Sequence, residues 1–520
     1  MELWPRVNNA RYDVSQARSE CTQGTRVDVL HRICTWALGS SSDSPPVYWL
    51  CGMGGTGKST IAKTIAGKLD DSKEEEYPRI LAGTYFCSRQ SGDTRNLFNI
   101  IPTISHQLAR RVRSYARALL DADVVDFATT TNPKLQIQKL LVEPWHKSFQ
   151  CRTQLKSSYL IIIDALDELE NKGGAAFLEE LLATVKAGQL QGLKFLVTSR
   201  PDPQLVQRWE PFSRGKIFRL EEVSRNEVER DIETFLRHKL PALKHDNRIK
   251  VIAQRANGLF IYAATVVRIL NPRELSLPEQ ETQLTDILEK WPSNNDGNTI
   301  EIDDLYKEVI QSNLQRLGKH RATRLKILHA ILCTAEPLSV ATLADLLDQK
   351  EATVKQLVDS FHAVLFVASK DGCIYWYHTT FQDFFFDSER AHIIIADSNA
   401  RLNVFCHQAS IHAFLTKRCF LTMESLHFNI CELPSSFLLD DEVEDIDKRR
   451  QKITEALRYS SRHWGWHLAR EENLDNELFT LLVRFLDEHL LFWIEAMNLV
   501  RSKSQCIPQL RDARKWVQKV

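Results

Sequence analysis

The run Gly52-Met53-Gly54-Gly55-Thr56-Gly57-Lys58-Ser59 combines residue types and a spacing that can hold the phosphates of a nucleotide. It fits the pattern G-x-x-x-x-G-K-[ST]. Its glycines let the backbone turn N–H groups toward phosphate oxygens. In this pattern Lys58 reaches the β- and γ-phosphates, and the hydroxyl of Ser59 binds Mg²⁺.

The flanks of this loop supply the context that the motif needs. Val47–Cys51 is a short apolar run typical of a buried strand, and Thr60–Ala66 has helical spacing. Thr60, which follows the motif directly, is included among the predicted nucleotide contacts. A helix that begins near Lys58 also directs the positive end of its dipole at the phosphates. We therefore favour a nucleotide-binding loop over a simple glycine turn.

A second acidic motif is expected beside this loop. In Ser158–Glu168 a hydrophobic strand ends at Asp164. The end of a parallel strand places such a carboxylate at the edge of the sheet where the phosphate loop lies. We expect Asp164 to hold Mg²⁺, through water, opposite Ser59.

Three further side chains are predicted to take part in hydrolysis. Asp167 and Glu168 follow the strand, and either can orient or deprotonate the water that attacks the γ-phosphate. We favour Glu168 and leave Asp167 open. Arg200 ends the apolar run Leu196–Ser199 and can contact or neutralise the γ-phosphate. The alternatives are a solvated acidic turn and a surface arginine that caps a strand.

These residues are predicted to lie in a nucleotide-binding domain over 29–222. Residues 1–28 are polar and form an N-terminal linker segment, followed by a helix over Val29–Leu38. Strands then alternate with helices, which indicates a five-stranded parallel α/β sheet. The predicted strands are Val47–Cys51, Ile80–Cys87, Tyr159–Asp164, Lys194–Thr198 and Lys216–Leu220.

Three domains are expected after residue 222. A helical domain over 223–298 contains helices at Asn226–Leu240, Arg248–Ala256 and Leu259–Leu270, and its boundary is the loop around Trp291–Gly297. Residues 299–392 combine helices with two short strands, Val364–Val367 and Ile374–Tyr377, as a winged-helix domain does. Residues 393–520 are predicted to be all helical, with His489–Met497 as a buried helix.

Composition limits the class of protein. The chain has 520 residues, and its basic and acidic residues number 67 each, so net charge favours neither nucleic acid nor an anionic membrane. The 11 cysteines have no metal-finger spacing and fit a reducing compartment. No signal-peptide core and no membrane-spanning apolar stretch is seen. We expect a cytoplasmic protein without a membrane span.

Three weaker signals are discounted. The candidate recognition helix Ala352–Asp359 carries one lysine beside acids, which does not favour DNA binding. His463 and His467 have the spacing of a metal pair but lie among tryptophans, which favours packing. The acidic run Asp440–Asp445 is interpreted as a solvated loop.

The motifs together resemble the NACHT family of signal-transducing P-loop ATPases, specifically the fungal and nephrocystin-like type, a group of the STAND class. The resemblance extends over roughly residues 20–470, and the motifs occur in the family's order. The matching segments are Gly24–Arg26, Gly52–Ser59, Asp164–Glu168, Thr198–Pro201, Ala256–Ala264, Glu336–Ser339 and His378–Phe385. Ala165 stands where many relatives have glycine, and Thr379-Thr380 replaces a pair that ends in serine.

The resemblance implies an ATP/ADP-binding switch with slow hydrolysis, in which nucleotide state controls closed or open domain packing and self-association. It implies that Pro337 lines the adenine side and that His378 contacts the ADP phosphates as a latch. By itself, a histidine at this strand end is more often structural. The implied biology is fungal innate immunity, non-self recognition or programmed cell death, with an unknown protein partner. The effector and repeat domains that usual relatives carry are not recognised before residue 20 or after residue 470.

Two alternatives remain open. One is a rapidly cycling ATPase that remodels a partner. The other is an interaction scaffold that binds no nucleotide.

Overall fold

The computed structural model describes residues 6–14, 19–39, 44–70, 78–120, 125–149, 158–209, 215–271, 273–290, 301–315, 321–395, 400–435, 437–472 and 476–519. Its internal contacts divide the chain into two compact units. The first comprises Met1–Leu305 together with His378–Thr380, and the second comprises Tyr306–Tyr377 and Phe381–Val520.

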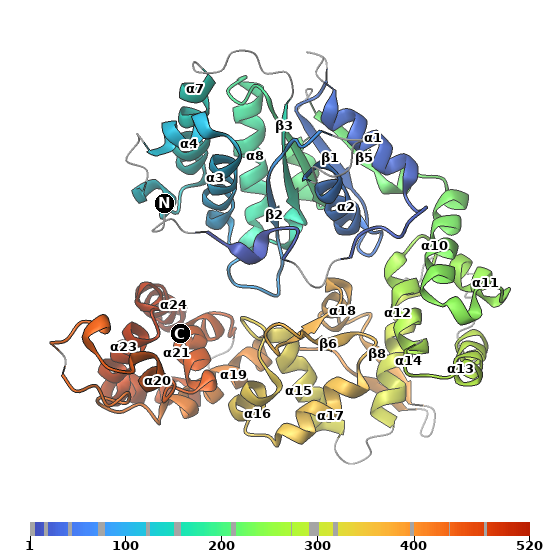
Figure 1. Ribbon diagram of the computed structural model, residues 1–520. Coiled ribbons are helices and arrows are strands. Elements are labelled where there is room, and N and C mark those ends of the chain that lie inside the picture. The colour runs from blue at the N-terminus through green and yellow to red at the C-terminus, as the bar shows by residue number, and fades with distance from the viewer. Residues whose placement is uncertain are drawn as a thin grey trace. The chain divides into compact units, whose positions relative to one another are not determined.

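The first unit is built on a five-stranded sheet with the order β2-β3-β4-β1-β5, in which all neighbouring strands are parallel (Figure 1). This confirms the predicted α/β architecture. The strands are β1 (Val47–Cys51), β2 (Leu81–Phe86), β3 (Tyr159–Asp164), β4 (Leu193–Ser199) and β5 (Gly215–Arg219). β1 and β3 have the predicted bounds, and the ends of the other three differ from the prediction by one residue.

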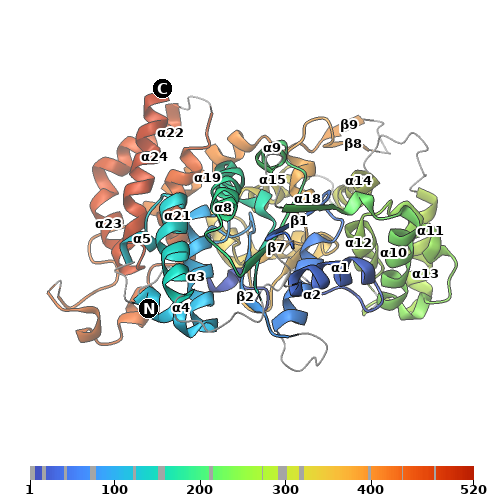
Figure 2. The same ribbon diagram turned by 90° about the horizontal axis from the view of Figure 1, so that it is seen from above.

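Helices cover both faces of this sheet (Figures 1 and 2). Along β1, Val47 and Trp49 belong to one hydrophobic core, whereas Tyr48 and Leu50 belong to the other. This alternation follows from the pleat, and burial of both faces explains the continuous apolar runs. One core includes α1 (Val27–Leu38) and α2 (Lys58–Asp70). The other includes α3 (Ile100–Arg111), α4 (Arg113–Leu120), α7 (Glu143–Phe149), α8 (Gly173–Lys186) and α9 (Pro203–Trp209).

Part of the predicted N-terminal linker segment packs against the sheet. Val7 and Ala10 are buried in the same core as α3. The amide of Tyr12 donates a hydrogen bond to Oγ1 of Thr84 in β2, at 3.2 Å. Residues 6–14 therefore contribute to the core of the first unit.

The first unit also contains shorter helices and a helical segment after the sheet. The shorter helices are α5 (Val125–Ala128) and α6 (Pro133–Gln136). The later helices are α10 (Arg225–Lys239), α11 (Arg248–Arg255), α12 (Phe260–Leu270) and α13 (Leu277–Lys290). The first three were predicted to within one residue, whereas α13 was not predicted. The predicted boundary loop around Trp291–Gly297 lies outside the described residues.

The first part of the second unit has the elements expected there. After α14 (Glu301–Gln315), in which the two units divide, come α15 (Arg321–Cys333), α16 (Val340–Leu347) and α17 (Glu351–Ser360). β6 (Leu365–Val367) and β7 (Ile374–Trp376) then form an antiparallel pair, and α18 (Thr379–Phe385) follows. The interpretation of these elements as a winged helix stays a prediction.

The C-terminal region is helical from Gln408 onward. Its helices are α19 (Gln408–Met423), α20 (Ile446–Arg450), α21 (Glu455–Leu468), α22 (Asn476–Arg484), α23 (Leu490–Leu499) and α24 (Cys506–Lys519). A second antiparallel pair, β8 (His392–Ile395) with β9 (Ala400–Asn403), precedes them, so the prediction of an all-helical region from residue 393 was wrong at its start. The β-branched run Ile393–Ile395 favours a strand, and we overlooked this signal.

Two local predictions in this region need correction. α23 buries Trp493 and Met497 but leaves Leu491 76% exposed, so only one of its faces is buried. In the acidic run, the described acids are exposed as predicted, but Asp440 begins a short 3₁₀ turn and pairs with Arg450. Among the described residues, no helix is both long and apolar enough to cross a bilayer.

Candidate functional site

The phosphate loop joins the end of β1 to the start of α2. Gly55 has φ +84° and Gly57 has φ +96°, values that only glycine adopts without steric cost. The carboxyl ends of β1, β3 and β4 share one edge of the parallel sheet. Three of the predicted motifs therefore meet at this edge, where α/β sheets bind ligands.

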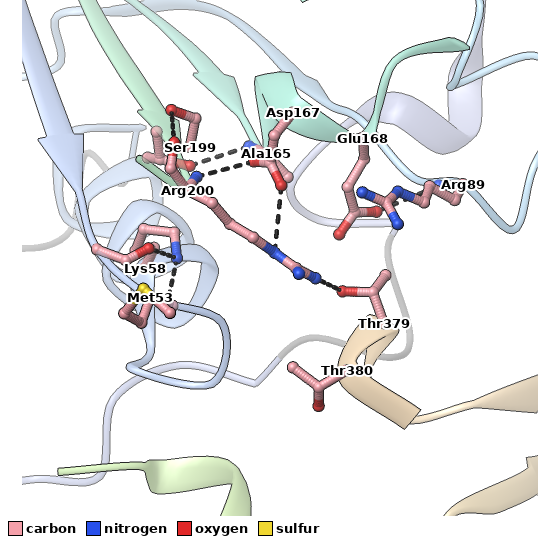
Figure 3. Close-up of polar contacts among 12 residues, drawn as sticks. Met53, Lys58, Arg89, Ala165, Asp167, Glu168, Ser199, Arg200, Thr379 and Thr380 are labelled. Carbon is pink, nitrogen blue, oxygen red and sulfur yellow. Dashed lines mark hydrogen bonds and ion pairs between the residues drawn. The ribbon is translucent and has the colours of Figure 1, made fainter. Parts of the chain in front are cut away.

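Lys58 begins α2 and points back into the loop (Figure 3). Its Nζ donates hydrogen bonds to the carbonyl oxygens of Gly52 and Met53, at 2.6 and 2.8 Å. Burial lowers the pKa of this ammonium group, and the positive charge of Arg200 lowers it further, whereas the negative charges of Asp167 and Asp164 raise it. A buried cation is thus held near the predicted acids.

Asp164 is completely buried at the end of β3. The hydroxyl of Thr198 in β4 donates to Oδ1 of Asp164 at 2.5 Å and accepts from the amide of Ala165 at 2.9 Å. Because Thr198 fixes one carboxylate oxygen, the orientation of Asp164 is set by the neighbouring strand. The sequence motif contained Thr198, but we did not predict this role.

Asp167 holds Arg200. Its Oδ1 accepts from the backbone amide of Arg200 at 3.0 Å, and its Oδ2 lies 3.3 Å from Nε of the same residue. The Arg200 side chain extends from Asp167 to Thr379, and its Nη2 donates to Oγ1 of Thr379 (Figure 3). Asp167 is therefore placed to orient an arginine.

Glu168 lies on the other side of Asp167 (Figure 3). Its Oε2 accepts a hydrogen bond from the amide of Arg89 at 3.2 Å. Since Asp167 already binds Arg200 at two points, this arrangement favours Glu168 as the base. That assignment stays a prediction.

Residues His378–Thr380 belong to the first unit and approach the phosphate loop. A β-carbon at Gly54 would lie 2.8 Å from Cγ2 of Thr380, so a larger residue there would force one of the two to move. The amide of Thr380 donates to Nδ1 of His378 at 3.2 Å. In this arrangement Nδ1 is an acceptor, so the proton of the neutral ring is on Nε2.

The loop is also fixed by residues that we did not predict to belong to the site. Arg26 is buried, donates through Nη2 to the carbonyl of Thr56 at 2.9 Å, and lies over the ring of Phe260. Its amide donates to Oδ2 of Asp231 in α10, at 3.1 Å. Gly24–Arg26 was noted only as a family motif, and nothing in the local sequence indicates that Asp231 is its partner.

The remaining predicted residues have fewer contacts with the site. Ser59 and Thr60 are half-buried in the first turn of α2. Met53 is exposed, and its amide donates to Oε1 of Glu221 at 2.7 Å. Pro337 belongs to the second unit, so its predicted role stays a prediction. Among the described residues, no group of three His, Cys, Asp or Glu side chains has the arrangement of a metal site.

Comparison with known families finds a match that includes this site. Residues 24–200 match the family model described as "Nephrocystin 3, N-terminal". This match begins at Gly24, ends at Arg200 and includes the phosphate loop and Asp164. This match supports the resemblance to NACHT-like P-loop NTPases that the motifs indicated.

A curated relative extends the likeness over nearly the whole chain. The vegetative incompatibility protein HET-E-1 of Podospora anserina is 24% identical over 548 aligned residues, covering 98% of this chain. The chain spans only 37% of the length of that relative.

Solved structures that resemble this chain include two proteins from Pyrococcus species. One is a STAND protein with a tetratricopeptide repeat sensor from Pyrococcus horikoshii, with 12% identity, a TM-score of 0.36, and coverage of 100% of this chain and 65% of that one. The other is a Walker-type ATPase of Pyrococcus abyssi, with 11% identity, a TM-score of 0.32, and coverage of 70% and 97%.

Proposed function

We propose that this protein is an ATP/ADP-binding switch with slow ATP hydrolysis, whose nucleotide state controls domain packing and self-association. The observation that carries the proposal is the hydrogen bond from Arg200 to Thr379. It joins an arginine at the phosphate-binding edge of the sheet to a segment 179 residues away in the chain. A ligand that competes for this arginine would release that segment.

The residues at the loop fit a nucleotide. Lys58 is a buried cation with neutral carbonyl partners, and such a group gains energy from an added phosphate charge. Asp164 and Ser59 supply the oxygen ligands that Mg²⁺ prefers. When bound there, Mg²⁺ would neutralise the charge that develops on the phosphate oxygens.

We assign opposite roles to Arg200 and His378. A γ-phosphate is a stronger acceptor for the guanidinium of Arg200 than the neutral hydroxyl of Thr379, so triphosphate favours release of residues 378–380. His378 keeps a proton on Nε2 and can donate it to a diphosphate, which favours retention of the same segment. The two nucleotides therefore stabilise different arrangements.

Hydrolysis returns the switch to its diphosphate state. Glu168 orients or deprotonates the attacking water, and Asp167 positions Arg200. A switch needs hydrolysis that is slower than its response, whereas a remodelling ATPase needs several turnovers per second.

Three measurements test this function. Mass spectrometry of the purified native protein should identify a bound adenine nucleotide, and single-turnover assays should show slow hydrolysis with retained ADP. Lys58→Ala should remove nucleotide binding. Rapid turnover would instead support the remodelling ATPase. Absence of nucleotide binding in the folded wild-type protein would leave only the scaffold.

We further propose that the switch acts in the cytoplasm, in fungal non-self recognition or programmed cell death, through a protein partner. The support is the relative from Podospora anserina, whose name refers to vegetative incompatibility. Light scattering of the protein with ADP and with a non-hydrolysable ATP analogue tests self-association. A mass increase only with the ATP analogue is expected, and equal masses in both states would contradict nucleotide-controlled assembly.

A further inference from the structure

A basic pocket lies between the N-terminal segment and α3, on the face of the sheet opposite α2. Its volume is about 130 Å³, and its polar lining includes Arg6, Asn8, Arg11, Thr103, His106 and Arg110. The N-terminal segment runs beside α3 in both views (Figures 1 and 2). The amide of Val7 donates to Oγ1 of Thr103 at 3.1 Å and so fixes the segment on the helix.

The positive charges around this pocket are only partly compensated. Arg11 forms two hydrogen bonds with Asp13, at 2.9 and 2.7 Å. Within the described part of the chain, neither Arg6 nor Arg110 has a carboxylate partner. Arg6 instead donates through Nη1 to Nε2 of His106, at 3.0 Å. Among the described residues, two guanidinium groups beside this pocket thus have no carboxylate partner.

The pKa of His106 is lowered in this pocket. Burial lowers its pKa, and the charges of Arg6, Arg110 and Arg11 lower it further. Since a guanidinium can only donate, Nε2 of His106 must accept from Arg6, which requires that nitrogen to be unprotonated. The arrangement therefore keeps the ring neutral among arginines.

The negative end of the α3 dipole accounts for only one of the three arginines that line the pocket. Arg110 lies in the last turn of the helix, where the dipole attracts cations. Arg6 and Arg11, however, come from a separate segment that crosses the helix. Thr103 adds a neutral donor, because it is 3% exposed, accepts from Val7, and has no acceptor for its own hydroxyl hydrogen within the described residues.

We propose that this pocket binds a phosphate group, as inorganic phosphate or as a phosphate monoester, independently of the nucleotide loop. Guanidinium groups bind phosphate oxygens through paired N–H donors, and a dianion would balance the charges of Arg6 and Arg110. The same chemistry is presented by a free phosphorylated metabolite and by a phosphorylated lipid headgroup.

The test is calorimetric titration of orthophosphate into the full chain saturated with ADP, at constant ionic strength. The same titration into Lys58→Ala removes any contribution of the phosphate loop and any dependence on the proposed nucleotide switch. We expect saturable binding in both proteins. Absence of saturable binding in both would overturn the proposal.

Variants localise the binding. Arg6→Gln combined with Arg110→Gln should weaken phosphate binding at least about tenfold, because two charge-assisted hydrogen bonds are lost. Arg117→Gln, an exposed arginine on α4, is the matched control and should leave the Kd unchanged. Equal affinity in the double variant and the control, with unchanged melting temperatures, would contradict the assignment.

The two sources of phosphate are then separated. Titration of glycerol 3-phosphate tests a free monoester, and sedimentation with phosphatidylcholine vesicles that contain phosphatidylinositol 4-phosphate tests a headgroup. Binding that depends on Arg6 and Arg110 in either assay supports the pocket and identifies the source. Vesicle binding that persists in the double variant would count against a headgroup in this pocket.

Discussion

The amide of Ile261 donates a hydrogen bond to the carbonyl oxygen of Gly55, at 3.2 Å. This contact joins the first turn of α12 to the phosphate loop. A β-carbon at Gly55 would lie 2.2 Å from Cγ2 of Ile261, so the Ile261 side chain leaves no room for a larger residue at this position of the loop. The shape of the loop is therefore coupled to the position of α12, so the proposed nucleotide binding would be linked to the helical segment of the first unit.

Substitution of Gly55 by alanine should disturb this contact. A side chain at φ +84° costs about 1–2 kcal/mol, and the clash with Ile261 adds overpacking of a similar size. We expect Gly55→Ala to lower the free energy of unfolding by about 3 kcal/mol and to weaken nucleotide binding. Chemical denaturation and nucleotide titration measure the two effects.

Gly188→Ala is the control for backbone strain alone. Gly188 has φ +73°, and a β-carbon there meets nothing within 4 Å. The variant should lower the free energy of unfolding by only about 1 kcal/mol. Equal losses for the two variants would show that the contact with Ile261 is not tight.

The stability of the protein should depend on both members of the buried pair formed by Arg26 and Asp231. Burial lowers the pKa of Arg26 and raises that of Asp231, so desolvation exceeds their mutual attraction. We expect Asp231→Leu to lower the free energy of unfolding by about 3 kcal/mol, because it leaves Arg26 as a buried charge without a partner carboxylate. The double variant Arg26→Met with Asp231→Leu should recover part of this loss, as measured by a double-mutant cycle.

Glu229→Ala is the matched control on the same helix. Glu229 pairs with Arg225, whose side chain is 69% exposed. Loss of this exposed ion pair should lower the free energy of unfolding by under about 1 kcal/mol. An additive double variant would mean that Arg26 and Asp231 do not interact energetically.

Replacement of Thr198 by valine should affect the proposed Mg²⁺ ligand. The isosteric change removes the donor to Oδ1 of Asp164 and the acceptor of the Ala165 amide. Because such partners orient a metal ligand, we expect nucleotide affinity in Mg²⁺ to fall about tenfold. Affinity in EDTA should change much less. Thr184→Val, which removes a hydroxyl bond to Glu180 within α8, should alter neither value.

His329 should make stability depend on pH. Burial lowers its pKa from 6.5 to about 4, although its hydrogen bond to the carbonyl of Val404, at 2.9 Å, acts in the opposite direction. The unfolded chain therefore binds more protons than the folded one between about pH 6.5 and pH 4. The free energy of unfolding should fall through this window by up to about 3 kcal/mol and then level off.

Urea unfolding as a function of pH tests this dependence. In His329→Gln the slope between pH 6.5 and pH 4 should become smaller. His362→Gln, at an exposed position, should retain the wild-type slope. An unchanged slope in His329→Gln would exclude His329 as its source.

The sequence predictions were most accurate for elements with a clear hydrophobic pattern in neighbouring residues, and failed for elements without one. β1 and β3 were located residue by residue, because strands buried on both faces need continuous apolar runs. The pair β8 and β9 was missed because its strands are only four residues long, too short to show a period, and because the β-branched residues of β8 were overlooked. α13 was missed because the Pro-, Asn- and Gly-rich sequence around it obscured its helical spacing.

The amino-acid sequence by itself determined the phosphate loop, the acid at the end of β3 and the parallel sheet that positions them. These features depend on residues that are adjacent in the chain, where backbone sterics and hydrophobic periodicity act locally. Only the tertiary structure decided that Asp167 holds Arg200, that Arg200 donates to Thr379, and that Asp231 is paired with Arg26. Those partners are brought together by burial of the two cores, and no local pattern specifies which distant polar groups will meet when water is excluded.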